Sequence, residues 1–240
     1  MKVRGERECK ECGTRWSYYE TGSVECPSCG SLLSVGTDEE RKLHTASTAE
    51  LDLSDARLRL DGPRGVEASA EAAAEACRAW IRRQGFLGGG ELLPLSDRHL
   101  AVAELANVAG ELARRMTVDD DEEYHYLTLL RGAEEGERPE PEAVPDSLRE
   151  ARGLAVGQAV SEYVSEVRTY LDEHPDSEGR RLVERIGDHA KRVRAVDGAV
   201  PPEDAERLVA ATRALQRYLA GEESALLDAE SRLDALEAGP

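Results

Sequence analysis

The chain has 240 residues and a net charge of −18, and its hydrophobic residues, 40% of the total, include one Phe, two Trp and two Met. This length accommodates one small module and one domain of about 150 to 180 residues, whose core must consist mainly of Leu, Val and Ala. No stretch approaches the roughly 20 consecutive apolar residues of a membrane span, and the start MKVRGERECKEC lacks the apolar segment of a secretory signal, so a cytoplasmic protein without membrane contact is expected.

Two cysteine pairs with the same internal spacing lie within the first thirty residues. Cys9 and Cys12 form one C-x2-C, Cys26 and Cys29 form the second, and thirteen residues separate the pairs. A glycine follows each pair directly and can adopt the positive φ that a tight turn requires. Because cytoplasmic thiols stay reduced, this spacing predicts a metal site rather than two disulfides. Four protein sulfurs leave no open position, so one structural Zn²⁺ is expected, while iron in a rubredoxin-like site fits the same ligands.

Residues 14 to 24, between the two pairs, carry the pattern of a strand followed by a turn. Thr14, Trp16 and Tyr18 alternate with Ser17 and Tyr19, which predicts a strand. A glycine at position 22 favours a turn, and the return strand is expected to begin at position 24. Two metal-binding knuckles joined by a β-hairpin form a zinc ribbon, which we assign to residues 1–45.

This ribbon is similar to that of the transcription factor B family of archaea and eukaryotes, over about the first 36 residues. The resemblance implies that Cys9, Cys12, Cys26 and Cys29 are metal ligands. It does not imply promoter binding, because the chain lacks the repeated cyclin-like helical units that bind promoters in that family. The chain also resembles uncharacterised zinc-ribbon proteins of halophilic archaea, through stretches such as LGGGELLPL and RGLAV, a family without an established activity.

Residues 46–65 are expected to link the ribbon to a helical domain over 66–240. Leucines at positions 51, 53, 58 and 60 alternate well enough for a short strand that ends before a Gly-Pro pair. The Pro-rich stretch 134–146 is a candidate boundary within the domain. The predicted fold is therefore mainly α with a small β part, an N-terminal zinc ribbon followed by an all-α domain. Apolar spacing and capping residues predict helices over 66–84, 96–116, 119–130, 146–173, 177–196 and 202–237.

The last predicted helix carries a heptad seam, interrupted at Glu222 beside Gly221. We expect this seam to pack onto helices 146–173 and 177–196 as an antiparallel bundle, and dimerisation is the alternative. The seam positions are Leu208, Thr212, Leu215, Leu219, Glu222, Leu226, Ala229, Leu233 and Leu236.

No complete catalytic motif is present in the sequence. A di-iron site of the rubrerythrin type needs Glu-x-x-His on two helices, and only Glu122 and His125 have this spacing. The triple glycine at 88–90 lacks the Gly-Lys-Ser/Thr of a phosphate-binding loop. Cys77, among alanines, is expected to be an inert buried thiol, and the adjacent Asp188-His189 cannot face one another on a helix. An enzyme whose site residues are scattered along the chain is therefore the third hypothesis, after binding of a protein and binding of nucleic acid.

The ribbon is the part of the chain best suited to contact an anionic partner. Residues 1 to 36 contain five cations and five acids, so the rest of the chain carries the whole net charge. An alternative is that these cations only balance the −2 charge of a zinc tetrathiolate. A tryptophan at the position of Trp16 also belongs more often to the small core of a ribbon than to a platform on which bases stack. A protein partner is expected, with nucleic acid as the alternative. The candidate contact residues are Lys2, Arg4, Arg7, Lys10, Arg15, Trp16, Tyr18 and Tyr19.

The charge balance suggests a halophilic cytoplasm. Acidic residues outnumber basic ones by 49 to 31, and four of the cations are lysines. At about 1 M salt the screening length is about 3 Å, so self-repulsion of an acidic surface largely vanishes. The binding of nucleic acid by counterion release also weakens as salt rises. A GC-rich genome, which favours Arg over Lys, is the alternative explanation.

Overall fold

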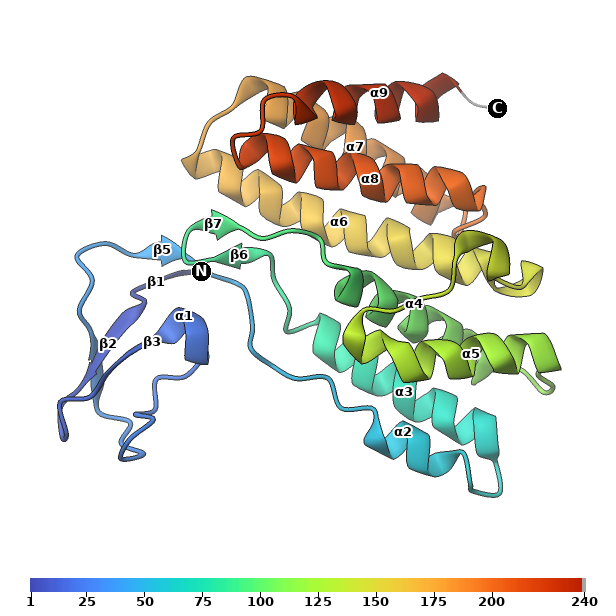
Figure 1. The fold of residues 1–240 in the computed structure, drawn as a ribbon, viewed down its shortest axis with the longest axis horizontal. Helices are drawn as coiled ribbons and strands as arrows, with labels where there is room; N and C mark the ends of the chain where they lie inside the picture. The colour runs from blue at the N-terminus through green and yellow to red at the C-terminus, as the bar shows by residue number, and fades with distance from the viewer. Residues whose placement is uncertain (239–240) are drawn as a thin grey trace.

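The structure, a computed structural model, describes residues 1–238. Figure 1 shows a lobe of short strands near the N-terminus beside a body of helices. The predicted fold class, mainly α with a small β part at the N-terminus, is confirmed. Among the described residues, no helix is long and apolar enough to cross a membrane.

The elements follow one another in short segments, with most strands in the first 45 residues. In chain order they are β1 (Lys2–Val3), β2 (Glu6–Cys9), β3 (Arg15–Ser17), α1 (Tyr18–Thr21), β4 (Ser34–Gly36), β5 (Lys42–Leu43), α2 (Ser54–Arg59), α3 (Gly65–Ile81), β6 (Leu87–Gly88), β7 (Glu91–Leu92), α4 (Asp97–Leu112), α5 (Asp120–Gly132), α6 (Arg149–Glu173), α7 (Ser177–Ala195), α8 (Pro202–Leu219) and α9 (Ala225–Ala238). Three 3-10 turns, Ala133–Glu135, Pro141–Ala143 and Asp146–Leu148, lie between α5 and α6.

The ribbon sheet is built around β2, which pairs antiparallel with β3 on one side and β4 on the other. The predicted hairpin between residues 14 and 24 is therefore wrong, because β3 pairs back onto β2 across the first cysteine pair. The chain leaves β3 as the helical turn α1, which Gly22 closes at φ 64° by donating its N–H to the Tyr18 carbonyl (2.8 Å). Tyr18 N–H in turn donates to the Gly5 carbonyl (2.7 Å), so this turn is fixed to the start of β2.

A strap from β5 to residue 46 joins the ribbon to the helical body. β1 pairs with β5, and the strap continues along the β6–β7 hairpin, where Thr45 N–H donates to the Leu87 carbonyl (2.8 Å). The Glu166 carboxylate on α6 accepts from Thr45 Oγ1 (2.6 Å) and from the Phe86 amide (2.5 Å). The sequence does not indicate the β6–β7 hairpin, because each of its strands has only two residues. Its turn is formed by Gly89 (φ 60°) and Gly90 (φ 94°), the two positive φ angles of a type I′ turn.

The strand predicted within 46–65 is wrong, because its leucines belong to a loop followed by α2. Leu53 is fully buried and Leu58 is 74% exposed, which matches one buried side of a helix rather than one face of a strand. The Asp52 carboxylate accepts the Ser54 N–H (2.9 Å) and so satisfies a donor at the start of α2. The division into residues 1–45, 46–65 and 66–240 stays a prediction.

The final predicted helix is two helices, α8 and α9, with a reversal between them. Gly221, at φ 103°, lies in that reversal and adopts a conformation that interrupts a helix. Leu208, Leu215 and Leu233 from the predicted seam are buried in one core together with α6 and α7. The seam therefore packs within the chain, as expected, but as a helical hairpin rather than as one long rod.

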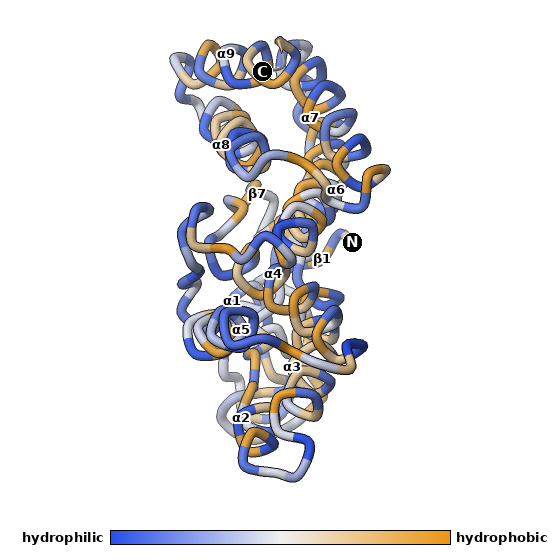
Figure 2. The backbone as a smooth tube through the Cα atoms, turned by 90° about the vertical axis from the view of Figure 1, so that its right-hand side faces the viewer, coloured by the Kyte–Doolittle hydropathy of each residue, from blue (hydrophilic) through white to orange (hydrophobic). Residues whose placement is uncertain are grey.

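Two hydrophobic cores share α4. The first joins α6, α7, α8 and α9 to one side of α4, and the second joins α2, α3 and α5 to its other side. Seen from the side in Figure 2, the helices stack from α9 at one end, through α6 and α4, to α2 at the other. Alanines fill much of the second core, which lets α3 approach α4 closely.

Candidate metal centre

The two C-x2-C pairs form turns with the same backbone hydrogen bonds. In the first turn Gly13 N–H donates to the Cys9 carbonyl (3.1 Å), and Cys9 N–H donates to the Thr14 carbonyl (2.9 Å). In the second, Gly30 N–H donates to the Cys26 carbonyl (2.9 Å), and Cys26 N–H donates to the carbonyl of residue 31 (2.9 Å). Both glycines have φ 72°, the left-handed conformation that the spacing predicts. The repeated sequence therefore produces a repeated structure.

The four sulfurs converge on one point. Cys9 Sγ lies 3.6 Å from Cys29 Sγ, and Cys12 Sγ lies 3.5 Å from Cys26 Sγ. All four lie within 4.8 Å of one another. Zinc–sulfur bonds of about 2.3 Å in a tetrahedron place sulfurs about 3.8 Å apart. The donor set and its spacing therefore fit a closed tetrahedral ion, and a metal here would hold the fold together.

The thiols are too close for all four to ionise without a cation. The Thr14 side chain and backbone hydrogen-bond to Cys12 and lower its pKa to about 6. At Cys29, the Ser31 backbone lowers the pKa, but the hydrogen bond with Cys12 and burial outweigh it and raise the pKa to about 12. The close approach of the thiols thus moves the pKa values of Cys12 and Cys29 in opposite directions. A divalent cation stabilises the thiolate form of all four.

Aromatic side chains of the ribbon contact the protein itself. Trp16 is 7% exposed and packs with Cys9 and Cys26, and its Nε1 donates to the Ser23 carbonyl (3.0 Å). Tyr19 lies between the ribbon and the body: its hydroxyl donates to a β1 carbonyl (3.0 Å), and its ring packs against Gly5 on one side and against Gly89 of the β6–β7 turn on the other. Tyr18 is half-buried on the same α1 turn. Trp16 therefore contributes to the core of the ribbon.

The five candidate cations have different surroundings. Lys2 pairs with Glu173 on α6 (2.6 Å), and Arg15 pairs with Glu8 (2.8 Å). Arg7 Nε and Nη2 donate to Ser34 Oγ (3.0 and 2.9 Å) without an acidic partner. Arg4 and Lys10 are exposed and, among residues 1–238, form no ion pair. Of the five candidate cations, Arg4, Arg7 and Lys10 therefore have no acidic partner among residues 1–238.

Comparison with protein families matches residues 1–233 to a family of unknown function, DUF7117. The chain belongs to this family. The match covers the ribbon and the helical body together, so the combination of the two is a property of the family. No curated protein and no solved structure matches the chain.

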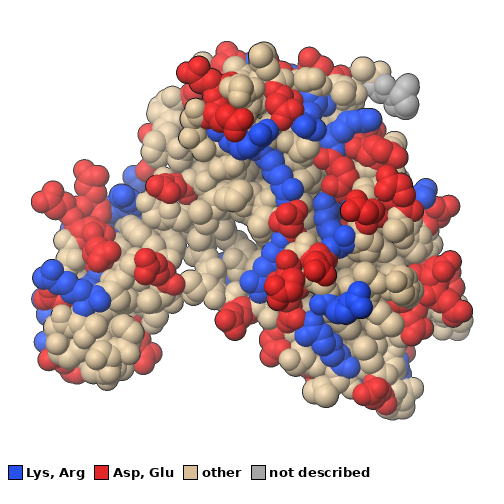
Figure 3. Space-filling model, in the orientation of Figure 1, with Lys and Arg blue, Asp and Glu red and all other residues tan. Residues whose placement is uncertain are grey.

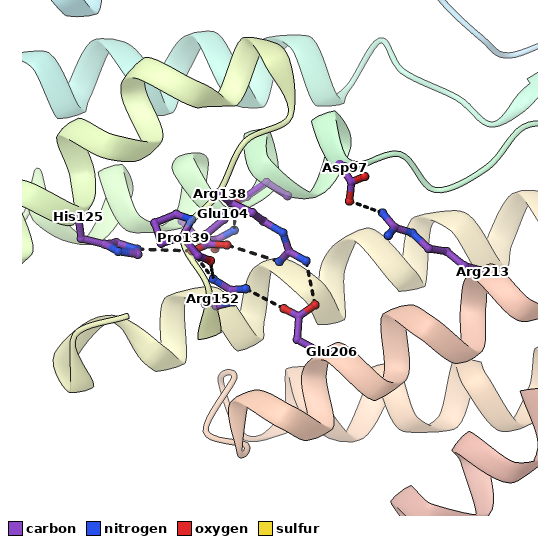
Figure 4. Close-up of polar contacts among 10 residues, drawn as sticks. Asp97, Glu104, His125, Arg138, Pro139, Arg152, Glu206 and Arg213 are labelled. Carbon is purple, nitrogen blue, oxygen red and sulfur yellow. Dashed lines mark hydrogen bonds and ion pairs between the residues drawn. The ribbon is translucent and has the colours of Figure 1, made fainter. Parts of the chain in front are cut away.

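A second polar cluster, which the sequence did not indicate, lies between the two hydrophobic cores (Figure 4). Glu104 on α4 and Arg152 on α6 are 0% and 3% exposed. Arg152 reaches Glu104 Oε1 (3.3 Å) and Glu206 Oε1 on α8 (2.8 Å), while Arg138 reaches Glu206 Oε2 (2.9 Å) and Glu104 Oε2 (3.6 Å). His125 Nε2 on α5 lies 3.4 Å from Glu104 Oε1. We call these five residues the buried charge network.

The buried charge network balances two acids with two arginines. Burial raises the pKa of Glu206, but Arg138 and Arg152 lower it further, so the net shift is below the ordinary value. Arg152 also donates to the Pro139 carbonyl (2.7 Å), which ties the Pro-rich stretch 134–146 to α6. A cleft of about 830 Å³ opens beside the network, and every arginine that lines it is already paired with an acid. This arrangement holds elements together and leaves no free arginine for a ligand.

The motifs set aside in the sequence have structural roles. Glu122 caps α5 and pairs with Arg115, while His125 is part of the buried charge network, so the Glu-x-x-His spacing serves two different contacts. Cys77 is fully buried, and burial raises its pKa to about 12, as expected for an inert thiol. Within residues 1–238 the four ribbon cysteines are the one cluster of three or more possible metal ligands.

Proposed function

We propose that the ribbon is a zinc-stabilised protein-interaction module and that the helical body is the scaffold that presents it. The carrying observation is the distribution of exposed apolar side chains. Five of the eleven large hydrophobic side chains exposed in residues 1–238 belong to the first 36 residues. Four of them, which we call the ribbon apolar surface, are Val24 (43%), Leu32 (70%), Leu33 (61%) and Val35 (39%).

The ribbon apolar surface flanks the second metal-binding turn, with Val24 before the turn and the other three residues after it, and hydrogen bonds hold its backbone in place. Ser34 Oγ donates to the Val24 carbonyl (2.7 Å), and Lys10 N–H donates to the Leu33 carbonyl (2.8 Å). Exposed apolar groups on a rigid support are typical of protein contact sites. A nucleic-acid site is less well supported, because Trp16 lies in the ribbon core and the half-buried Tyr19 ring packs against Gly5 and Gly89. A site for bases needs exposed aromatic faces and a track of cations.

Zinc is the proposed metal, because four thiolate ligands that leave no coordination position for water are typical of structural zinc sites. A cytoplasmic location is proposed with it, since reduced thiols are required. The resemblance of the ribbon to that of transcription factor B favours a transcription complex as the setting. This assignment rests on the first 36 residues alone.

Replacement of two exposed leucines should abolish partner capture. In the tagged, full-length protein, Leu32→Ser/Leu33→Ser removes the two most exposed side chains of the ribbon apolar surface while leaving their backbone hydrogen bonds in place. We expect the amount of each specifically retained polypeptide to fall about tenfold or more, because buried apolar anchors dominate binding energy. The measurement is affinity capture from the source cells at their native ionic strength, with quantification of co-purified polypeptides and nucleic acid.

The matched control is Leu58→Ser/Leu227→Ser, at leucines that are 74% and 70% exposed on α2 and α9. This control should retain the same partners as the unchanged protein. Equal losses in both variants, or retention of nucleic acid but no polypeptide by the unchanged chain, would exclude the proposed function.

We also propose that the chain is adapted to a salt-rich cytoplasm. Acidic side chains cover much of the body, interleaved with basic ones, as Figure 3 shows for one face. Screening of a net charge of −18 removes repulsion in the folded state. The midpoint of thermal unfolding should therefore rise by at least about 5 °C between about 0.1 M and about 2 M KCl. Calorimetry measures this change, and a flat or falling midpoint contradicts the adaptation.

A further inference from the structure

A pocket on the ribbon concentrates positive charge on an otherwise acidic molecule. The pocket has a volume of about 380 Å³, and four of its nine lining residues are cations, namely Lys2, Arg4, Arg7 and Arg41. None of the nine is acidic. On a chain of net charge −18, a concave site with cations and no carboxylate is a local reversal of sign. Such a site attracts anionic groups and focuses the field on them.

The fold brings Arg4 and Arg7 together without an acid between them. Arg7 in β2 lies opposite Gly36 in β4, and paired residues share a face of the sheet. The Arg4 side chain occupies the space above Gly36, where an added Cβ would lie 2.6 Å from Arg4 Cβ. A glycine at position 36 therefore allows Arg4 to lie beside Arg7. Two neighbouring arginines repel one another, and a bound anion offsets this repulsion and accepts hydrogen bonds from both guanidinium groups.

Two acids of the ribbon near these cations, Glu8 and Asp38, are engaged elsewhere. Glu8 pairs with Arg15. The Asp38 carboxylate accepts the backbone N–H groups of Gly5 (2.7 Å) and Glu6 (2.9 Å). Arg4, Arg7 and Arg41 form no ion pair among residues 1–238. The guanidinium groups of Arg4 and Arg41 are therefore available to a ligand from outside the chain, while that of Arg7 is held beside them by its hydrogen bonds to Ser34.

The pocket has apolar walls that continue into the ribbon apolar surface. Val3 and Tyr18 line it together with Val24, and Val24 also belongs to the ribbon apolar surface. A ligand with carboxylates alone would make no apolar contact with these side chains. The walls suit a peptide in which acidic side chains are mixed with apolar ones.

We propose that this pocket binds the glutamate or aspartate side chains of an acidic, partly apolar segment of a partner protein, an inference that rests on the proposed function. A nucleic-acid backbone fits less well. Duplex DNA carries one charge per about 1.7 Å and needs a long track of cations. Four cations around one concave site, of which only Lys2 has an acidic partner within residues 1–238, lie beside a body that carries nearly all of the net charge of −18. This arrangement selects a short group of carboxylates instead.

The test uses the full-length, zinc-loaded protein and a fluorescein-labelled peptide of twelve residues that alternates pairs of Glu with Leu. Fluorescence anisotropy at about 0.1 M KCl, where charge interactions still reach about 10 Å, measures its affinity. Arg4→Ser/Arg41→Ser should weaken binding about tenfold or more, since guanidinium–carboxylate hydrogen bonds are among the stronger ones. The same peptide with Gln for Glu should bind the unchanged protein at least about tenfold more weakly.

The matched control is Arg82→Ser/Arg83→Ser, which removes the same charge from exposed residues just after α3. This control should bind the peptide within about twofold of the unchanged protein. Equal affinity of the Arg4/Arg41 variant and the unchanged protein overturns the proposal. So does tighter binding of single-stranded DNA of twelve nucleotides that requires Arg4 and Arg41. Partner capture that needs Leu32 and Leu33 but not Arg4 and Arg41 would overturn the pocket assignment and leave the proposed function intact.

Discussion

Cys26→Ser should remove the bound metal and unfold the ribbon while the helical body stays folded. Cys26 is 2% exposed and its sulfur lies 3.5 Å from that of Cys12, so a serine hydroxyl leaves the ion with three thiolates. Binding of structural zinc contributes roughly 10 to 16 kcal/mol in small finger peptides, far more than a module of this size obtains from burial. We expect one zinc per chain in the unchanged protein and none in the variant.

Elemental analysis, far-UV circular dichroism and limited proteolysis together measure this effect. The variant should keep its helical signal, and new cleavage sites should lie within residues 1–41. The control is Cys77→Ser, the same substitution at the fifth cysteine, which is buried in α3 far from the ribbon sulfurs. It should keep the zinc. Loss of the helical signal in Cys26→Ser would show that ribbon and body fold as one unit, and iron in place of zinc would correct the metal.

Arg152→Leu should destabilise the helical body by about 3 to 5 kcal/mol. This change leaves Glu104, which is fully buried, with one distant arginine at 3.6 Å and removes a donor from the Pro139 carbonyl. An uncompensated buried charge costs about this much. For a chain of this size the thermal midpoint should fall by roughly 6 to 20 °C. Calorimetry or urea unfolding monitored by circular dichroism measures the loss.

Two further variants separate the buried charge from a general effect of the substitution. Arg168→Leu, on the same helix, removes an ion pair whose side chains are 36% and 56% exposed, and it should cost about 1 kcal/mol or less. The double variant Glu104→Leu/Arg152→Leu should recover at least half of the lost stability, because Arg138 and Glu206 remain paired at 2.9 Å. A cost for Arg152→Leu no larger than that for Arg168→Leu would contradict the role of the network.

The four-cysteine cluster and most helices could be predicted because their signals are local. The spacing within C-x2-C-Gly determines a turn of a few residues, and capping residues such as Ser96 and Asp119 accept N–H groups three positions on. α4 and α5 accordingly begin one residue after these caps. The same reasoning explains why the predicted bounds of α6 and α7 differ from the structure by only a few residues.

The parts that the sequence left hidden depend on contacts between distant segments. β3 pairs with β2 rather than with the residues after it, because closing the first metal turn brings these strands together. The buried charge network joins Glu104, Arg152 and Glu206, which are separated by 48 and 54 positions. The cationic pocket likewise requires Arg41 to lie near Arg4. The spacing of residues along the chain does not indicate such long-range contacts, and a single sequence contains no signal that shows which distant residues are in contact.

The strap at residues 42–46 has a consequence for how a bound partner is positioned. Its hydrogen bonds to the β6–β7 hairpin and to Glu166, together with the Lys2–Glu173 ion pair, restrict rotation of the lobe relative to α6. A partner protein bound to the ribbon would therefore be held at a fixed angle to the helical body, and the part of the partner outside the binding site would face the carboxylates of that body. A partner that is acidic in this outer part would be repelled, so the helical body would limit by shape and charge which proteins can bind the ribbon.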